Sequence, residues 1–325
     1  MQYLKNLICL AIITNLLLFI GCSSKPPSLL EATSVEKEFL EGFNKTAKFE
    51  YALHTTTRIS GKTFWIYIAT EKDLLQISSI SGTGGVMPEK IIKFLDIKCH
   101  YKSSAFNLNY IFLKYTSEEK DIERDLFRKT LGGTTLYQDF THTTIEILQK
   151  AYLAIGDIIS KTEDMNFFAI CLANIKKGIK ITFVIHRLDM EQFLTNMLPS
   201  DEFYNRMILK TEGNKEILND KYGLSIEYND ISLINFLEEQ IVNNSRTKVS
   251  EMEKYNSVQL KSLDKLDELI LKTTYDVITK YEFDDYMLVE VEDIITKNKL
   301  SLSKSRLLRK FSGPPPSYYS EEYNL

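Results

Sequence analysis

Residues 167–187 read FFAICLANIKKGIKITFVIHR, and this stretch decides the class of fold. Two runs rich in β-branched and aromatic residues, 167–174 and 179–187, flank the short polar segment Lys176-Lys177-Gly178. Strand-forming runs that are joined by a short, glycine-containing turn are typical of a β-hairpin. The stretch therefore predicts two neighbouring antiparallel strands.

Similar patterns recur on both sides of this hairpin. A second hairpin is expected from residues 48–59 and 63–69, which are joined by Ser60-Gly61-Lys62. Further strands are expected at 74–80, 107–115 and 224–228. Helices are expected at 31–43, 89–95, 118–130, 144–161, 189–197, 200–206 and 230–241. The clearest is 144–161, whose apolar residues lie on one stripe and which Thr141 or Thr143 can cap. Asp230 is expected to cap the last helix.

These elements predict an α+β fold: a mostly antiparallel sheet of hairpins, with one face covered by helices 144–161 and 230–241. The expected globular domain covers residues 31–245 and ends at Asn243-Asn244-Ser245. Beyond it, residues 246–312 contain no Gly or Pro and predict a C-terminal helical segment that packs on the sheet domain or binds a partner. The proline-rich tail 313–325 is expected to be extended or disordered.

The N-terminus has the parts of a cleaved secretory signal. Lys5 supplies positive charge, and residues 7–20 form an apolar run that only Thr14 and Asn15 interrupt. This run is shorter than the roughly 20 residues that a membrane-spanning helix needs. Residues 1–21 are therefore predicted to be a signal peptide, followed by a tether over 22–30.

The sequence Phe19-Ile20-Gly21-Cys22 resembles the processing site of bacterial lipoproteins. The resemblance implies cleavage between Gly21 and Cys22, a diacylglyceryl thioether on the Cys22 sulfur and a fatty acyl chain such as palmitate on its amino group. It also implies anchoring to a membrane of the cell envelope. Ser23 resembles the pattern that directs such proteins to the outer membrane, facing the periplasm. The rest of the chain is similar only to uncharacterised bacterial lipoproteins, and that likeness implies no activity.

Composition narrows the partners and the redox chemistry. The net charge is −4 and the isoelectric point is about 5.8, so a nucleic acid is not expected as a partner. Cys9 leaves with the signal, and only Cys99 and Cys171 remain as thiols. Each lies in a mainly apolar neighbourhood, which favours two separate buried thiols, although an oxidising compartment leaves a disulfide open.

Few residues suggest catalysis. Asp139 with His142, and His186 with Asp189, place a carboxylate three residues from an imidazole, as a zinc site could require. No His-Glu-x-x-His motif accompanies them, and the glycine-rich segments 82–85 and 132–133 are not followed by a Lys-Ser/Thr pair. We expect no cofactor, no metal and no catalytic residue, with a metal-dependent envelope hydrolase as the alternative.

The clusters of charged residues are explained by ion pairs within helices and by solvent-exposed helical faces. Glu202 and Arg206 are spaced as an i,i+4 ion pair in a short helix. The basic residues near the C-terminus predict a solvated helical face, with anionic lipid as the alternative partner: Lys297, Lys299, Lys304, Arg306, Arg309 and Lys310. The chain is thus expected to be a lipid-anchored, non-enzymatic accessory domain that binds a second envelope protein or a small ligand.

Overall fold

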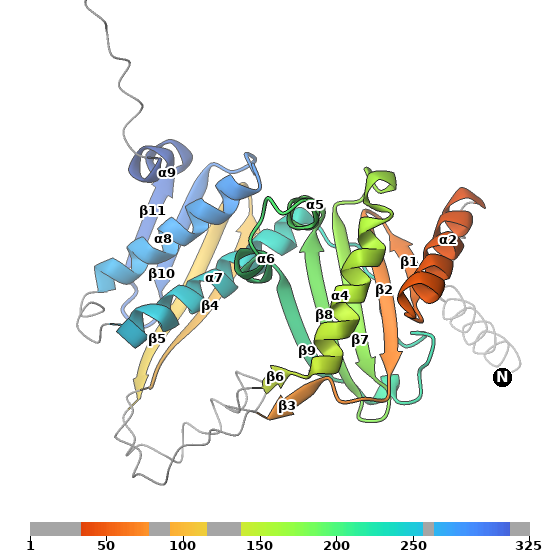
Figure 1. Ribbon diagram of the computed structural model, residues 1–325. Helices are drawn as coiled ribbons and strands as arrows, with labels where there is room; N and C mark the ends of the chain where they lie inside the picture. The colour runs from red at the N-terminus through yellow and green to blue at the C-terminus, as the bar shows by residue number, and fades with distance from the viewer. Residues whose placement is uncertain (1–33, 78–91, 116–137, 256–262, 313–325) are drawn as a thin grey trace, which may run out of the picture. The chain divides into compact units, whose positions relative to one another are not determined.

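The computed structural model describes residues 34–77, 92–115, 138–255 and 263–312 (Figure 1). The chain divides into two compact units, residues 1–42 and 43–325. The predicted signal peptide, Cys22, both glycine-rich segments, the expected helix 118–130 and the predicted tail lie outside the described residues. None of the described helices is long and apolar enough to cross a membrane.

The α+β class is confirmed, with seven α-helices and two mixed, mostly antiparallel sheets in the described part of the chain. The larger sheet has the strand order β1-β2-β7-β8-β9: β1 (Thr56–Ser60), β2 (Thr63–Thr70), β7 (Phe167–Asn174), β8 (Ile179–His186) and β9 (Ile208–Gly213). Both predicted hairpins are present, as β1–β2 and as β7–β8. The two hairpins join through β2 and β7, which pair in parallel.

The turn between β7 and β8 shows why its glycine is needed. Gly178 has a φ of +67°, a region that L side chains rarely adopt. A Cβ at this position would also lie 2.9 Å from the carbonyl oxygen of Asn214. The turn and the segment that follows β9 can therefore approach each other only with glycine here.

The smaller sheet has the order β11-β10-β5-β4, with β5 and β10 parallel: β4 (Ile92–Lys102), β5 (Ala105–Tyr115), β10 (Leu288–Asp293) and β11 (Lys299–Ser303). The short strands β3 (Leu75–Ile77) and β6 (Gln138–Phe140) pair separately. Several expected elements differ in the structure. Residues 92–95 are strand rather than helix, and 224–228 form no strand. The segment 246–312 contains the expected helices, but it also contains the strands β10 and β11.

The helices are α2 (Ser34–Tyr51), α4 (His142–Gly156), α5 (Arg187–Leu194), α6 (Ser200–Asn205), α7 (Leu233–Tyr255), α8 (Leu263–Lys280) and α9 (Lys304–Phe311), with 3₁₀ turns η1 (Ile159–Lys161) and η2 (Lys215–Ile217). Residues 48–51 thus continue α2 and are not part of a strand. Thr141 caps α4 as predicted, because its side chain accepts a hydrogen bond from the Thr144 N–H.

Helix α7 differs from the expectation at both places we named. Asp230 does not cap it, because its carboxylate accepts from the Lys62 N–H and the Thr63 hydroxyl instead. Ser232 takes the capping role and accepts from the Asn235 N–H. The helix also runs without a break through 243–245, where we expected the globular domain to end.

One apolar core extends over both sheets. It combines Phe167, Val184 and Ile208 of the larger sheet with one face of the smaller sheet and with buried residues of α7 and α8, which lie side by side (Figure 1). Cys99 belongs to this core and Cys171 to a smaller cluster on the larger sheet. Both thiols are free and buried, which confirms the expectation of two separate thiols.

Candidate binding site

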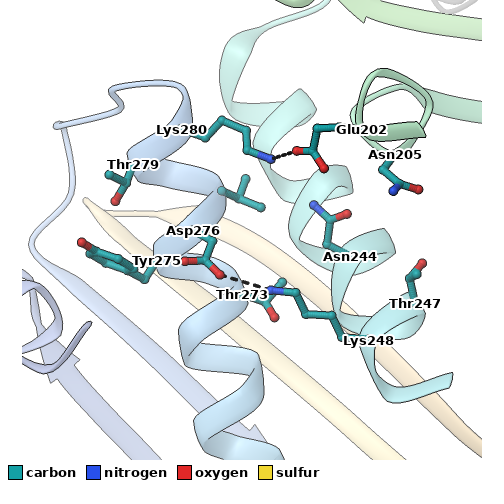
Figure 2. A pocket seen from close by; sticks show the side chains of 11 residues that line it. Glu202, Asn205, Asn244, Thr247, Lys248, Thr273, Tyr275, Asp276, Thr279 and Lys280 are labelled. Atoms are coloured by element: carbon teal, nitrogen blue, oxygen red, sulfur yellow. Dashed lines mark hydrogen bonds and ion pairs between the residues drawn. The ribbon is translucent and has the colours of Figure 1, made fainter. Parts of the chain in front are cut away.

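A hollow of about 540 Å³ lies between α6, α7 and α8 (Figure 2). Its lining consists of one apolar residue, Val277, and charged, amide and hydroxyl side chains: Glu202, Asn205, Asn244, Thr247, Lys248, Thr273, Tyr275, Asp276, Thr279 and Lys280. Helical spacing explains the arrangement. Residues four apart share one face of a helix, so Asn244 with Lys248 and Asp276 with Lys280 point to the same side of α7 and α8.

Two ion pairs connect the helices around the hollow. Lys280 of α8 contacts Glu202 of α6 at 2.8 Å, and Lys248 of α7 contacts Asp276 of α8 at 3.2 Å. Figure 2 shows Asn244 between these two pairs. All four charged side chains are between 29% and 39% exposed. Ion pairs this exposed contribute about 0–1 kcal/mol, so their partners can be exchanged for groups of a ligand at small cost.

A buried network supports the α6 side of the hollow. Asp189 of α5 is 1% exposed. It accepts from Arg206 Nη1 at 2.8 Å and from the Tyr281 hydroxyl at 2.7 Å. Arg206 Nε also donates to Glu202 at 2.9 Å, which confirms the predicted i,i+4 pair. Gln240 of α7 donates to the Arg206 carbonyl. The network therefore holds α5, α6, α7 and α8 together.

The contacts in this network keep the Glu202 carboxyl ionised and the Tyr281 hydroxyl protonated. Burial alone would raise the pKa of the Glu202 carboxyl, but hydrogen bonds from Lys280 and Arg206 outweigh it and hold that pKa below its ordinary value. Burial and the neighbouring Asp189 carboxylate raise the pKa of Tyr281, so this phenol remains a hydrogen-bond donor. Glu202 thus presents a carboxylate to the hollow.

Neutral polar groups offer further contacts. Asn205, Thr247 and Thr279 are exposed at the rim. Asn244 donates to Gln240 at 3.3 Å, and its side-chain oxygen can accept from a ligand. Amide, hydroxyl, ammonium and carboxylate groups on one hollow can bind a small polar molecule that carries both signs of charge.

A second, smaller hollow of about 340 Å³ lies over β8 and β9, beside the start of α7. Trp65, Val184 and Phe236 contribute apolar surface to it. Its lysines are paired across it, Lys180 with Glu212 and Lys210 with Glu239. The larger hollow has more neutral hydrogen-bonding groups, and we therefore regard it as the candidate site.

The histidine and aspartate pairs that we considered for zinc lie elsewhere. Asp139 is in β6 opposite Gln76, and His142 is exposed at the start of α4. His186 ends β8 and contacts the rings of Phe167, Phe236 and Tyr281: these ring centroids lie 5.1–6.0 Å from that of its imidazole.

The carboxylate of Asp189 already uses both oxygens for Arg206 and Tyr281. Among the residues that the structure describes, no three His, Cys, Asp or Glu side chains gather as a metal site. These contacts give the hydrolase alternative no support.

Three of the six basic residues near the C-terminus form ion pairs: Lys299 contacts Glu290, Lys304 contacts Asp284 and Lys310 contacts Glu268. Arg306, Arg309 and Lys310 are exposed on α9, as expected for a solvated helical face. Lys297 lies between β10 and β11, and Lys299 lies in β11, so the expected helix does not extend to them. The hollow itself was not predicted, because its polar residues come together only when α6 packs beside α7 and α8.

Comparison with known proteins adds no further assignment: no family model, no curated protein and no solved structure matches the chain.

Proposed function

We propose that this protein is a bacterial lipoprotein, anchored through acylated Cys22 to a membrane of the cell envelope, whose folded body acts by binding rather than by catalysis. The observation that carries the proposal is the run Phe19-Ile20-Gly21-Cys22 directly after a short apolar segment. Two or more acyl chains on one residue give stable membrane attachment, since each buried methylene contributes about 0.8 kcal/mol. In a two-membrane envelope, Ser23 favours the outer membrane.

The hollow between α6, α7 and α8 supports the binding part of the proposal. Its size falls in the range of small-molecule sites, about 300–1,000 Å³. Its exposed ion pairs can open toward a ligand, while the buried contacts of Asp189 keep the surrounding helices in place. We propose that it binds a small polar ligand or a polar segment of an envelope protein.

Labelling with radioactive palmitate tests the anchor. We expect the label to enter the wild-type chain and to be absent from Cys22→Ala, which should also lose its sedimentation with membranes. Cys9→Ala is the matched control, because Cys9 lies in the segment that is removed, and it should label like wild type. Equal labelling of wild type and Cys22→Ala would refute the anchor.

Native mass spectrometry of protein released from envelopes with detergent tests the hollow. We expect a bound mass that is lost when Asn244 and Thr247 are both replaced by leucine. Lys150→Leu, at a partly exposed site on α4 outside the hollow, is the control and should retain the mass. The same bound mass in all three proteins would count against the hollow.

A further inference from the structure

The segment between η2 and α7 exposes apolar side chains. Residues 218–225, here called the Asp220 loop, include Leu218, Tyr222 and Leu224, which are 43%, 67% and 75% exposed. The flanking residues Ile217 and Ile226 are buried in the small cluster on the larger sheet. The loop is thus attached to the sheet at both ends and presents its apolar residues outward.

Hydrogen bonds fix the loop from inside. The Asp220 carboxylate accepts from the N–H groups of Tyr222, Leu224 and Ser225 and from the Ser225 hydroxyl. Burial alone would raise the pKa of Asp220, but these bonds outweigh it and lower that pKa, so the charge stays on the carboxylate. The loop is therefore ordered before any partner arrives, which reduces the entropy cost of binding.

Gly223 fixes the loop further. Its φ is +65°, and a Cβ there would lie 2.2 Å from the Tyr228 hydroxyl oxygen and 2.8 Å from the Tyr67 ring. The Tyr228 hydroxyl donates to the Gly223 carbonyl at 2.8 Å, and the Tyr67 hydroxyl donates to the Asp220 carbonyl. Two aromatic side chains thus hold the loop against the sheet.

The backbone positions of Tyr222 and Leu224 lie close together. Their amide nitrogens lie 3.1 and 3.0 Å from the same Asp220 oxygen. The two exposed side chains therefore start from neighbouring points of the backbone. Tyrosine beside leucine is the composition of side chains that enter the interface of a bilayer, where the ring is apolar and its hydroxyl remains hydrated.

The charges around the loop balance. Residues 214–225 carry Lys215 and Lys221 against Glu216 and Asp220, so their sum is zero. A partner that recognises charge is not favoured by this surface. Its attraction for a bilayer would come from apolar burial, and it should depend little on salt or on anionic lipid.

We propose that the Asp220 loop is a membrane-contacting surface that inserts Tyr222 and Leu224 into the interface of the bilayer that holds the lipid anchor. This inference depends on the proposed anchoring at Cys22. The eleven residues 23–33 can span at most about 40 Å, so an anchored body stays close to the membrane. Three exposed apolar side chains supply only a small part of the roughly 800 Å² that each partner buries in a stable protein interface.

Spin labels on the acylated full-length protein test the insertion. Nitroxides are attached at Tyr222→Cys or Leu224→Cys, and at Met197→Cys as a control because Met197 is 70% exposed outside the loop. Cys99 and Cys171 are buried, so the introduced thiol is the reactive one. The protein is placed in vesicles of phosphatidylcholine and phosphatidylethanolamine, and collisions of the label with oxygen and with a soluble nickel chelate are measured.

We expect labels at 222 and 224 to show a several-fold fall in collisions with nickel and a rise in collisions with oxygen. The label at 197 should match its value without vesicles, and about 1 M salt should change none of these results. Three labels that all stay equally accessible to nickel on vesicle-bound protein would overturn the inference.

The outcomes separate this inference from the anchor. Protein that does not float with vesicles contradicts anchoring at Cys22, whereas vesicle-bound protein with exposed labels contradicts only the role of the loop. Protection in native envelope membranes but not in protein-free vesicles would identify a protein partner and refute the bilayer assignment.

Discussion

Replacing Asp189 with alanine should destabilise the folded body more than any other single change in the network beside the hollow. The carboxylate is 1% exposed and accepts from Arg206 at 2.8 Å and from Tyr281 at 2.7 Å. Removing one partner of a buried ion pair typically costs about 3–5 kcal/mol, because the other charge stays buried. Arg206 keeps Glu202 at 2.9 Å, so we expect the lower end, about 3 kcal/mol.

Two further variants of the same network should lose less unfolding free energy than Asp189→Ala. Tyr281→Phe removes one hydrogen bond to a charged group and should cost about 1.5 kcal/mol. Glu202→Ala should cost less than about 1 kcal/mol, because that carboxylate is 39% exposed and Arg206 retains Asp189.

Urea unfolding of the Cys22→Ala chain, followed by circular dichroism at neutral pH, measures all three. A loss below about 1 kcal/mol for Asp189→Ala, or a larger loss for Glu202→Ala, would refute the assignment of Asp189 as the central residue of the network.

Three further predictions concern other parts of the core. Burial holds the pKa of His186 below its ordinary value, with Arg187 adding to this effect and Asp189 opposing it. The unfolded chain then binds the proton first, so stability should fall as the pH drops below about 6.5, and His186→Leu should flatten that slope in urea titrations. The Ser245 hydroxyl is buried without a hydrogen-bond partner among the described residues, so Ser245→Ala should be neutral or stabilise by about 1 kcal/mol in thermal unfolding, and a loss would contradict this view. Burial raises the pKa of Cys171 to about 12 and raises that of Cys99, so iodoacetamide should modify neither thiol until urea unfolds the chain.

The hairpin 167–187 could be predicted because two strand-forming runs meet at a turn that needs glycine, and this local signal agrees with the final packing. Helix α4 could be predicted for a similar reason: the apolar stripe and Thr141 as cap are both local features. The parallel pairs β2–β7 and β5–β10 join segments about 100 and 180 residues apart, so neither segment alone indicates its partner.

Strand β10, which we expected to be helical, has the sequence pattern of a strand. In β10, Val289 and Val291 are buried while Glu290 and Glu292 alternate with them, which is the two-residue period of a half-exposed strand. The absence of Gly and Pro suggested helix and masked this period. Helix α7 shows the opposite effect, because Asn243-Asn244-Ser245 suggested a break but packing against α8 and β4 overrides the weak helix propensity of these residues.

The candidate site was hidden for a related reason. The four-residue spacing of Glu202 and Arg206 predicted their ion pair. Asp189, in contrast, contacts Arg206 and Tyr281 only when α5, α6 and α8 pack together. Nothing in the spacing of Asp189 and Tyr281 links one to the other. Sequence patterns therefore indicated the elements around the hollow more readily than the contacts between them.

Mass spectrometry of the N-terminal peptide, from protein isolated with the membrane fraction, tests the anchoring proposal most directly. We predict that the mature chain begins at Cys22 and carries a diacylglyceryl group on its sulfur and an acyl chain on its amino group. A chain that retains residues 1–21, or one whose Cys22 is present as a free thiol, would contradict it.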